Sequence, residues 1–346
     1  MDEILQLAME LIRLWTITPA ECKGALKQIS DYLKPTEWVI RHYESNNFPS
    51  MVVSPDRGKE FKYMLMGHVD VVPGTQMQFS PKVIGDRLYG RGAIDMKSQV
   101  AAMVVLVKRL AKIKPSMALM LTSDEEHGGE NGAKFLLENG FSCKFFITPD
   151  GGTNFRLITR EKGVLWLEIT ARGKTGHGST PWAGENAIDI LMEKLRRISK
   201  LFNNRNAWSN TVSIGKIRGG RAPNQIPDRA SALIDVRYTK DPEGLLASIG
   251  KIAEYRIAQK SPPLSTSYSH PEVKRLSRAM GSVLGKNAVP GFEHGASDAR
   301  YFAERGIPGA IFNPEGGGAH GREEYLVIPS LNKFYRILEL FVTGEK

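Results

Sequence analysis

The 346-residue sequence has only two cysteines, Cys22 and Cys143, and no long hydrophobic run. Two cysteines are too few for a disulfide framework or a cysteine-based zinc site, so a metal site here must be built from histidines and carboxylates. The longest apolar run, residues 100–107, is far shorter than the ~18 residues that a membrane span needs. Repeats and low-complexity tracts are also absent. Disulfide-rich, membrane-spanning and repeat proteins are therefore excluded.

The N-terminus lacks the basic residues with which a secretory signal begins. Its first residues, MDEILQLAMELIRLW, carry acids at that position, and their apolar side chains recur at helical spacing. We therefore predict that the chain starts with an amphipathic helix and that the protein is cytoplasmic.

Basic residues exceed acidic ones, with 47 Lys and Arg against 37 Asp and Glu and a net charge of +10. Residues 163–267 alone carry sixteen basic and nine acidic residues, a net charge of +7. The excess is spread along this segment and does not form a basic run with interleaved aromatics. It is typical of a solvated basic surface or of a surface that attracts an anionic substrate or partner. Nucleic acid is not the expected partner.

Two kinds of pattern divide the chain. Up to residue 162, short apolar runs at residues 50–53, 63–69, 117–123 and 144–150 alternate with helical patterns at residues 97–112 and 132–139. Such runs predict a mostly parallel sheet flanked by helices, because strands apolar on both faces must be covered on both faces. Helix and strand patterns resume after residue 271, with a last helix near residues 330–342.

The middle segment has a different pattern. Predicted strands at residues 164–173, 211–218 and 229–238 and helices at residues 183–202 and 242–255 give a β-α-β-β-α order, and residues 260–271 are predicted to be a linker. This order is typical of a small ferredoxin-like α+β domain. We therefore predict an α/β fold with a catalytic domain (residues 1–162 plus 268–346) and an inserted α+β domain (residues 163–267).

Candidate site residues follow the predicted strands of the catalytic domain. His68 and Asp70, in MGHVDVVPG, stand two residues apart at a strand end, where an acid can fix the tautomer of a metal-binding histidine. Glu125 and Glu126 follow Asp124 in SDEEHGGE, and three adjacent acids repel one another unless a cation neutralises them. A surface histidine and a solvated loop tip are the alternatives at these two places.

Three further motifs complete the set. Asp95 stands between a glycine-rich turn and a helix, Asp150 precedes two glycines in TPDGG, and His320 lies in a glycine-rich loop. Taken singly, these are also a helix cap, a turn residue and a loop histidine. Together the two histidines and the carboxylates suit two divalent ions such as Zn²⁺, Co²⁺ or Mn²⁺ that share one carboxylate.

The order of these motifs resembles the two-metal amidohydrolase and metallopeptidase family that contains acetylornithine deacetylase, succinyl-diaminopimelate desuccinylase, aminoacylase and glutamate carboxypeptidase. The resemblance extends over essentially the whole chain and implies a zinc-peptidase-like fold and two metal ions, zinc being expected before cobalt or manganese. It implies these roles: His68 and Asp150 on one metal, Glu126 and His320 on the other, Asp95 between both, Asp70 supporting His68, and Glu125 as the general base.

The inserted domain also resembles that of the family, where it forms a lid and a dimerisation domain. GKTGHGSTPW resembles the motif whose histidine, here His177, stabilises the oxyanion, in dimeric members from the other subunit. NQIPDRASALIDVR resembles the segment whose asparagine and arginine, here Asn224 and Arg237, hold the substrate. His177 in a glycine-rich turn and Arg237 near Asp235 also have structural interpretations.

The resemblance implies a hydrolase for the amide bond of small substrates that carry a carboxylate, and a homodimer through the lid. The first choice of substrate is an N-acyl amino acid, attacked by a water that bridges the metals and is activated by Glu125. Asp150, where deacylases of the family usually have Glu, favours the alternative of a dipeptidase, aminopeptidase or carboxypeptidase on short peptides. A catalytically inactive protein that binds partners through its basic lid is the alternative of another class.

Overall fold

A computed structural model of the chain describes residues 2–202 and 206–344. The chain divides into two compact units. Unit 1 comprises Met1–Arg160, Ser265–Glu293 and Ser297–Lys346, and unit 2 comprises Glu161–Leu264 and His294–Ala296. The ends of the main segment of unit 2 differ from those predicted by two or three residues.

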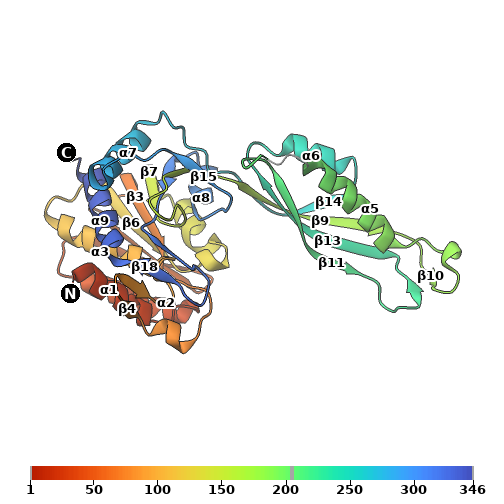
Figure 1. Cartoon of the computed structure of the whole chain (residues 1–346), viewed down its shortest axis with the longest axis horizontal. Helices are drawn as coiled ribbons and strands as arrows, with labels where there is room; N and C mark the ends of the chain where they lie inside the picture. Colours follow the sequence, from red (N-terminus) through yellow and green to blue (C-terminus); the bar gives the residue numbers. More distant parts are fainter. Residues whose placement is uncertain (1, 203–205, 345–346) are drawn as a thin grey trace. The chain divides into compact units, whose positions relative to one another are not determined.

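Unit 1 is built on an eight-stranded sheet (Figure 1). Across the sheet the strands are β1 (Val39–Ser45), β2 (Phe48–Ser54), β6 (Met117–Thr122), β3 (Glu60–His68), β7 (Ser142–Thr148), β16 (Gly309–Ile311), β8 (Ile158–Glu161) and β15 (Gly291–Glu293). The central strands β6, β3, β7 and β16 pair in parallel, whereas β1, β2 and β8 pair antiparallel with their neighbours. The predicted mostly parallel sheet is confirmed.

Helices cover both faces of this sheet. They are α1 (Glu3–Arg13), α2 (Pro19–Leu33), α3 (Lys97–Arg109), α4 (Phe135–Glu138), α7 (Pro271–Leu284), α8 (Ala299–Glu304) and α9 (Ile328–Thr343), with short turns η1 (Gln76–Phe79), η2 (Leu110–Lys112), η3 (Glu125–His127) and η4 (Glu130–Lys134). Successive side chains of β7 show the two layers, because they point to opposite faces. The Phe145 ring lies against Phe341 of α9, and the Phe146 ring stacks on Phe302 of α8.

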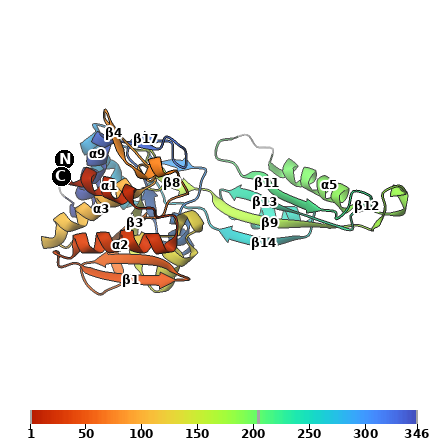
Figure 2. The ribbon, with the colours of Figure 1, turned by 90° about the horizontal axis from the view of Figure 1, so that it is seen from below.

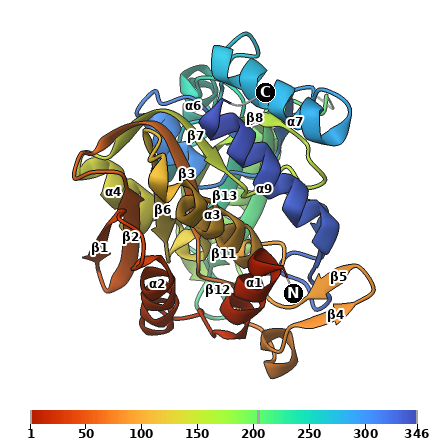
Figure 3. The same cartoon turned by 90° about the vertical axis from the view of Figure 1, so that its left-hand side faces the viewer.

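The apolar run at residues 100–107 forms most of α3, and every one of these side chains is fully buried. A helix that is apolar on all sides has to be covered on all sides. α3 accordingly packs between the sheet and the helices α1 and α9 (Figure 3). Among residues 2–202 and 206–344, no helix combines the length and the hydrophobicity that crossing a membrane requires.

A second, small sheet in unit 1 was not predicted from the sequence. Its strands are β17 (Gly316–Gly317), β18 (Tyr325–Val327), β5 (Arg87–Tyr89) and β4 (Lys82–Ile84), in that order. Strands of two or three residues carry too few side chains for a recognisable alternation. This sheet matters because the loops that carry Asp95 and His320 follow two of its strands, β5 and β17.

Unit 2 is a four-stranded antiparallel sheet with helices on one face (Figures 1 and 2). Its elements are β11 (Thr211–Gly219), β13 (Arg229–Tyr238), β9 (Gly163–Arg172) and β14 (Tyr255–Ser261) in sheet order, the short pair β10 (Gly176–His177) and β12 (Gln225–Ile226), helices α5 (Ala187–Ser199) and α6 (Glu243–Gly250), and turns η5 (Pro181–Ala183) and η6 (Lys200–Phe202).

The predicted β-α-β-β-α order lacks the last strand of unit 2. The helix predicted over residues 242–255 ends at Gly250, and the start of the predicted linker belongs to β14. Tyr255 and Ile257 stand two residues apart and lie opposite Ile169 and Leu167 of β9, so this segment alternates as a strand does. The prediction failed because β14 is an edge strand with few buried side chains, and its pattern is weak.

The described helices of unit 2 cover one face of its sheet. Leu165, Leu167 and Ile169 of β9 are buried against the helices, together with Ile234 and Val236 of β13. The alternate residues of both strands point to the other face, which we call the open face. Trp166, 38% exposed, lies on it.

Candidate metal centre

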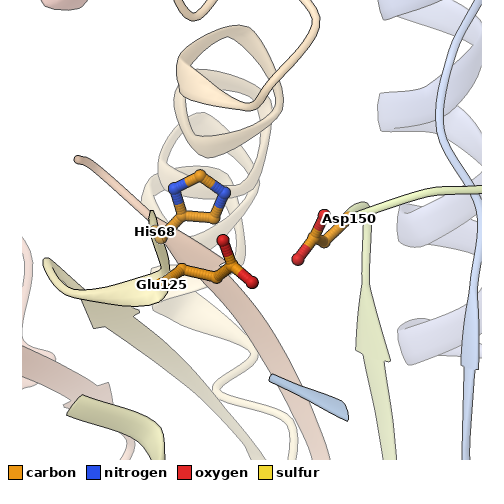
Figure 4. Close-up of side chains that lie close together, drawn as sticks. All are labelled: His68, Glu125 and Asp150. Carbon is orange, nitrogen blue, oxygen red and sulfur yellow. The ribbon is translucent and has the colours of Figure 1, made fainter. Parts of the chain in front are cut away.

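Three of the candidate residues meet where the central strands of unit 1 end. His68 is the last residue of β3, Glu125 follows β6 and Asp150 follows β7, and these strands are parallel neighbours in the sheet. Each residue offers one ligand atom, and the three atoms lie within 4.8 Å of one another. Figure 4 shows the carboxylate of Asp150 pointing toward Glu125 and the ring of His68. Because ligands collect at the carboxyl ends of parallel strands, this position favours a functional site.

The tautomer of His68 leaves one ring nitrogen available to a metal. Its Nδ1 donates a hydrogen bond to the backbone carbonyl of Asp70 at 3.0 Å, and a carboxylate oxygen of Asp70 lies 3.5 Å from the same nitrogen. The other oxygen of Asp70 accepts a hydrogen bond from the backbone N–H of Glu126 at 3.0 Å. When the ring is neutral and its proton is on Nδ1, Nε2 carries a lone pair directed toward the acids.

A second group consists of Asp95, Glu126 and His320, whose ligand atoms also lie within 4.8 Å of one another. His320 Nε2 is 3.0 Å from Glu126 Oε1 and 3.2 Å from Asp95 Oδ2. Our expectation that all candidate residues follow strands of one sheet was wrong. Asp95 and His320 lie in loops that follow β5 and β17 of the small sheet. These two strands are not part of the eight-stranded sheet, but their loops reach its edge.

Asp95 connects the two groups. Its Oδ1 lies 3.3 Å from His68 Nε2 and its Oδ2 lies 3.2 Å from His320 Nε2, so one oxygen faces each histidine. The peptide bond between Asp95 and Met96 is cis. A carboxylate in this position can offer one oxygen to each of two cations, which is the arrangement of a two-metal site.

The electrostatics of the two groups call for positive charge. Burial, reinforced by the charge of Asp95, raises the pKa of Asp150 to about 7, and burial followed by the charge of Asp150 raises the pKa of Glu125 well above its usual range. Burial acts on Asp95 in the same direction, but His320 and His68 outweigh it and hold the pKa of Asp95 below its usual range. Hydrogen bonding to Asp95 raises the pKa of His320 to about 9, although burial opposes it.

The donor set fits a pair of divalent cations. His68 Nε2 and Asp150 Oδ2 are buried and have no hydrogen-bond partner among the described residues. Buried polar atoms normally have a hydrogen-bond partner or a ligand, so these two atoms are candidates for metal coordination. Imidazole nitrogens and carboxylate oxygens are the ligands of Zn²⁺, Co²⁺ and Mn²⁺ in proteins.

Comparison with known proteins agrees with this chemistry. The profile of peptidase family M20/M25/M40 matches residues 64–344. The chain belongs to this family. It is 28% identical to succinyl-diaminopimelate desuccinylase of Wolinella succinogenes over 360 residues, which cover 97% of this chain and 98% of that enzyme.

Solved structures share the fold at lower identity. Aminopeptidase PepT from Bacillus cereus superposes with a TM-score of 0.81 at 19% identity, over 99% of this chain and 97% of that one. The YXEP protein of Bacillus subtilis, described as a dinuclear metal-binding peptidase of the M20 family, gives a TM-score of 0.73 at 17% identity, over 99% of this chain and 97% of that one. Membership of the M20 family makes the chain a metal-dependent hydrolase, and the expected family and fold are confirmed.

Sequence reasoning missed the residues that hold the second group in place in this M20 protein. Arg91 and Glu324 form a buried ion pair with a 2.7 Å contact. Glu324 Oε1 accepts hydrogen bonds from the backbone N–H groups of Ile94 and Asp95, at 3.0 and 3.1 Å. Arg91 Nη2 donates to the backbone carbonyl of His320 at 3.3 Å, and His320 has a φ of 62°, a conformation that non-glycine residues rarely adopt.

Asp298 is a second buried acid near the site. It belongs to GASDARYF, a segment that resembles the Ser-Asp loop near the substrate in the family, but it is not among the predicted site residues. It is 1% exposed, neither of its carboxylate oxygens has a hydrogen-bond partner among the described residues, and Arg300 lies 3.8 Å away. Burial raises its pKa to about 8, although the charge of Arg300 opposes this. Gly129, with a φ of 68°, allows the side chain of Asp298 to lie close to the backbone, because a Cβ at position 129 would clash with Asp298.

The other predicted site residues belong to unit 2. His177 of β10 lies opposite Gln225 of β12, and its Nδ1 is 2.7 Å from the hydroxyl of Ser179. The carbonyl of Asn224 accepts a hydrogen bond from the backbone of Gly178 at 2.7 Å, so Asn224 and His177 are neighbours. Arg237, near the other end of β13, makes a two-pronged ion pair with Asp235 at 2.9 and 3.0 Å.

Proposed function

We propose that the protein hydrolyses the amide bond of N-acyl amino acids, with Glu125 as the general base. The observation that carries the proposal is the position of Asp95 between His68 and His320, with Glu125 and Asp150 buried beside them. His68 and Asp150 would hold one metal, Glu126 and His320 the other, and Asp95 both. When bound, two divalent cations, zinc being expected first, polarise a substrate carbonyl and make water a stronger acid.

Glu125 would act as the general base and then as the general acid. Its carboxylate stands at the end of β6 and is within reach of the same point as His68 and Asp150. We infer that it takes a proton from the attacking water and passes it to the nitrogen of the leaving amine. Burial, which raises the pKa of Glu125, makes it a stronger base than an exposed carboxylate. His177 would stabilise the charge that develops on the carbonyl oxygen, and Asn224 and Arg237 would hold the substrate.

Two substitutions distinguish a general base from a metal ligand. We expect Glu125→Gln to lower kcat by several orders of magnitude while the protein still holds about two metals per chain. The matched variant Glu126→Gln should lose one metal as well as activity, because Glu126 contacts His320 directly. Metal content by elemental analysis and turnover, measured on the same preparations, check both. Loss of metal in Glu125→Gln would assign Glu125 as a ligand, and normal turnover would refute its role as the base.

Short peptides are the second candidate substrate. Asp150, where deacylases of the family usually carry Glu, favours them, and the similarity to aminopeptidase PepT agrees. The similarity to succinyl-diaminopimelate desuccinylase supports acyl substrates instead. Hydrolysis of acetyl-, succinyl- and aminoacyl-amino acids, compared at equal concentration, decides between the two. Cleavage of the aminoacyl compounds alone would replace the deacylase proposal by a dipeptidase.

A homodimer through unit 2 is part of the proposal. Asn224 and His177 lie beyond the Arg229 end of β13, and Arg237 lies near its other end. Arg237 lies eight residue steps along the strand from Arg229, about 26 Å at ~3.3 Å per step. One small substrate cannot touch both ends of the same unit 2. If both ends contact the substrate, they belong to two copies of the chain.

Unit 2 offers an edge for such pairing. β11 is an edge strand of nine residues, and its outer side is unpaired within the described sheet. Ile214 and Ile217 of β11 are 43% and 54% exposed, and Met192 of the adjacent helix α5 is 43% exposed. An exposed edge strand with apolar side chains favours pairing with a second copy. A metal-dependent hydrolase does not need a nucleic acid or a membrane as partner, and we expect neither.

A further inference from the structure

Four arginines come together at one end of the open face of unit 2. Arg172 of β9 lies directly opposite Arg229 of β13, and Arg218 of β11 lies opposite Ser231, one step diagonally from Arg229. Arg221 follows in the loop after β11. All four line one cavity of about 390 Å³. These residues are up to 57 positions apart in the sequence, so only the pairing of the strands unites them.

The cavity carries an excess of positive charge. Within residues 2–202 and 206–344, none of the four guanidinium groups makes an ion pair or a side-chain hydrogen bond. Two acids also line the cavity, Glu168 and Asp228. Glu168 is already paired with Arg256 at 2.7 Å, and Asp228 can offset only one of the four charges.

The arrangement is unfavourable without a partner. Like charges directly opposite each other on antiparallel strands destabilise the sheet, and Arg172 and Arg229 are such a pair. An anion between the two guanidinium groups would reverse the sign of this interaction. Arginine is well suited to it, because its planar fork forms paired hydrogen bonds to phosphate and carboxylate oxygens. The hydroxyls of Thr170 and Ser231 line the same cavity and can donate further hydrogen bonds.

We propose that this cavity is a binding site for a small anion with two or more negative charges, carried by phosphate or carboxylate groups. Its volume lies within the ~300–1,000 Å³ typical of small-molecule sites. The cavity is formed within unit 2 alone and contains none of the metal-site candidates, so the proposal does not depend on the function proposed above.

Titration calorimetry of the metal-loaded protein at low ionic strength tests the proposal. Inorganic phosphate and succinate serve as the two probes. The variant Arg172→Gln/Arg229→Gln removes the opposed pair. The matched control Arg196→Gln/Arg197→Gln removes the same charge from exposed positions of α5. Any anion held at the metal centre is bound equally by the wild type and by both variants, so the comparison isolates the cavity.

We expect the wild type to bind at least one probe with a dissociation constant in the millimolar range or below. Binding should weaken at least tenfold in Arg172→Gln/Arg229→Gln and change less than twofold in the control. A preference for phosphate or for succinate identifies the group that the site recognises. Equal binding by the cavity variant, equal losses in both variants, or no binding of either probe by the wild type would overturn the proposal.

A stability measurement covers the case in which the cavity variant is perturbed. In anion-poor buffer, removal of the opposed charges should leave the urea midpoint unchanged or raise it slightly. Added phosphate should raise the midpoint of the wild type and the control more than that of the cavity variant. A variant less stable than the wild type in anion-poor buffer would contradict the premise that the two charges repel.

Discussion

The buried ion pair of Arg91 and Glu324 offers a sharp test of how the second group of candidate ligands, Asp95, Glu126 and His320, is held in place. Both residues are almost inaccessible, at 3% and 2% exposure. Arg91→Met keeps most of the side-chain volume but leaves the carboxylate of Glu324 buried without its cation. Breaking one partner of a buried pair typically destabilises a protein by about 3–5 kcal/mol. We expect a value near 3 kcal/mol, because Oε1 retains the backbone donors of Ile94 and Asp95.

The same exchange should weaken metal binding. Arg91 donates to the carbonyls of His320 and Gly321, and Glu324 accepts from the backbone N–H of Asp95, so the pair links the loops of two candidate ligands. Loss of groups that orient metal ligands typically lowers metal affinity about 10–100-fold. We expect a loss in this range for the metal that Asp95 and His320 are proposed to hold.

Urea unfolding of metal-free protein and competitive zinc titration measure the two effects. Glu324→Gln should be comparably destabilising, and the double variant should lose less than the sum, since it leaves no unpaired charge. Arg336→Met, which breaks an exposed pair with Glu339, is the control and should change stability by less than about 1 kcal/mol. A loss below about 1 kcal/mol in Arg91→Met, or unchanged zinc affinity, would refute the role assigned to the pair.

Three further predictions follow from the site. If the protein forms the proposed homodimer and His177 acts on the partner's site, mixing the inactive variants His177→Ala and Glu125→Gln should restore about one quarter of wild-type activity, because half of the randomly mixed dimers hold one intact site; no recovery after subunit exchange between dimers would show action in cis. Metal-free protein should lose stability from pH 6 to 9, by up to about 1.4 kcal/mol per pH unit for each proton released. The pKa of Asp150, raised to about 7, and that of His320, raised to about 9, mean that the folded state holds protons that the unfolded chain has lost; zinc should reverse the trend, and urea midpoints that rise with pH without metal would contradict the prediction. Asp70→Asn should lower zinc affinity about 10–100-fold in competition titrations, because it weakens the support of His68; unchanged affinity would show that the backbone carbonyl of Asp70 suffices.

Much of the catalytic domain could be predicted from the chain alone, because its strands are short, strongly apolar and followed by chemically distinctive residues. His68 is the last residue of β3, and Glu125 and Asp150 follow shortly after β6 and β7, and parallel neighbouring strands bring such positions to one edge. The prediction failed for elements whose hydrophobic pattern is weak. For the residues of β14 the sequence predicts the end of a helix and a linker, since an edge strand with few buried side chains has little periodicity.

The residues that support and extend the site were beyond sequence reasoning. Arg91 and Glu324 are 233 positions apart, and no local pattern marks a buried ion pair. The basic excess of residues 163–267 looked evenly spread along the chain, yet strand pairing places Arg172, Arg218 and Arg229 in one cavity.

The sequence by itself determined the kind of chemistry, because residue types such as histidine and carboxylate bind metals wherever they converge, and it determined the family through the order of its motifs. Only the tertiary structure decided which oxygen of Asp95 faces which histidine, which charges are buried and paired, and which arginines have no partner among the described residues. Those properties depend on distance and on exclusion of water, and both arise only when segments far apart in the chain pack together.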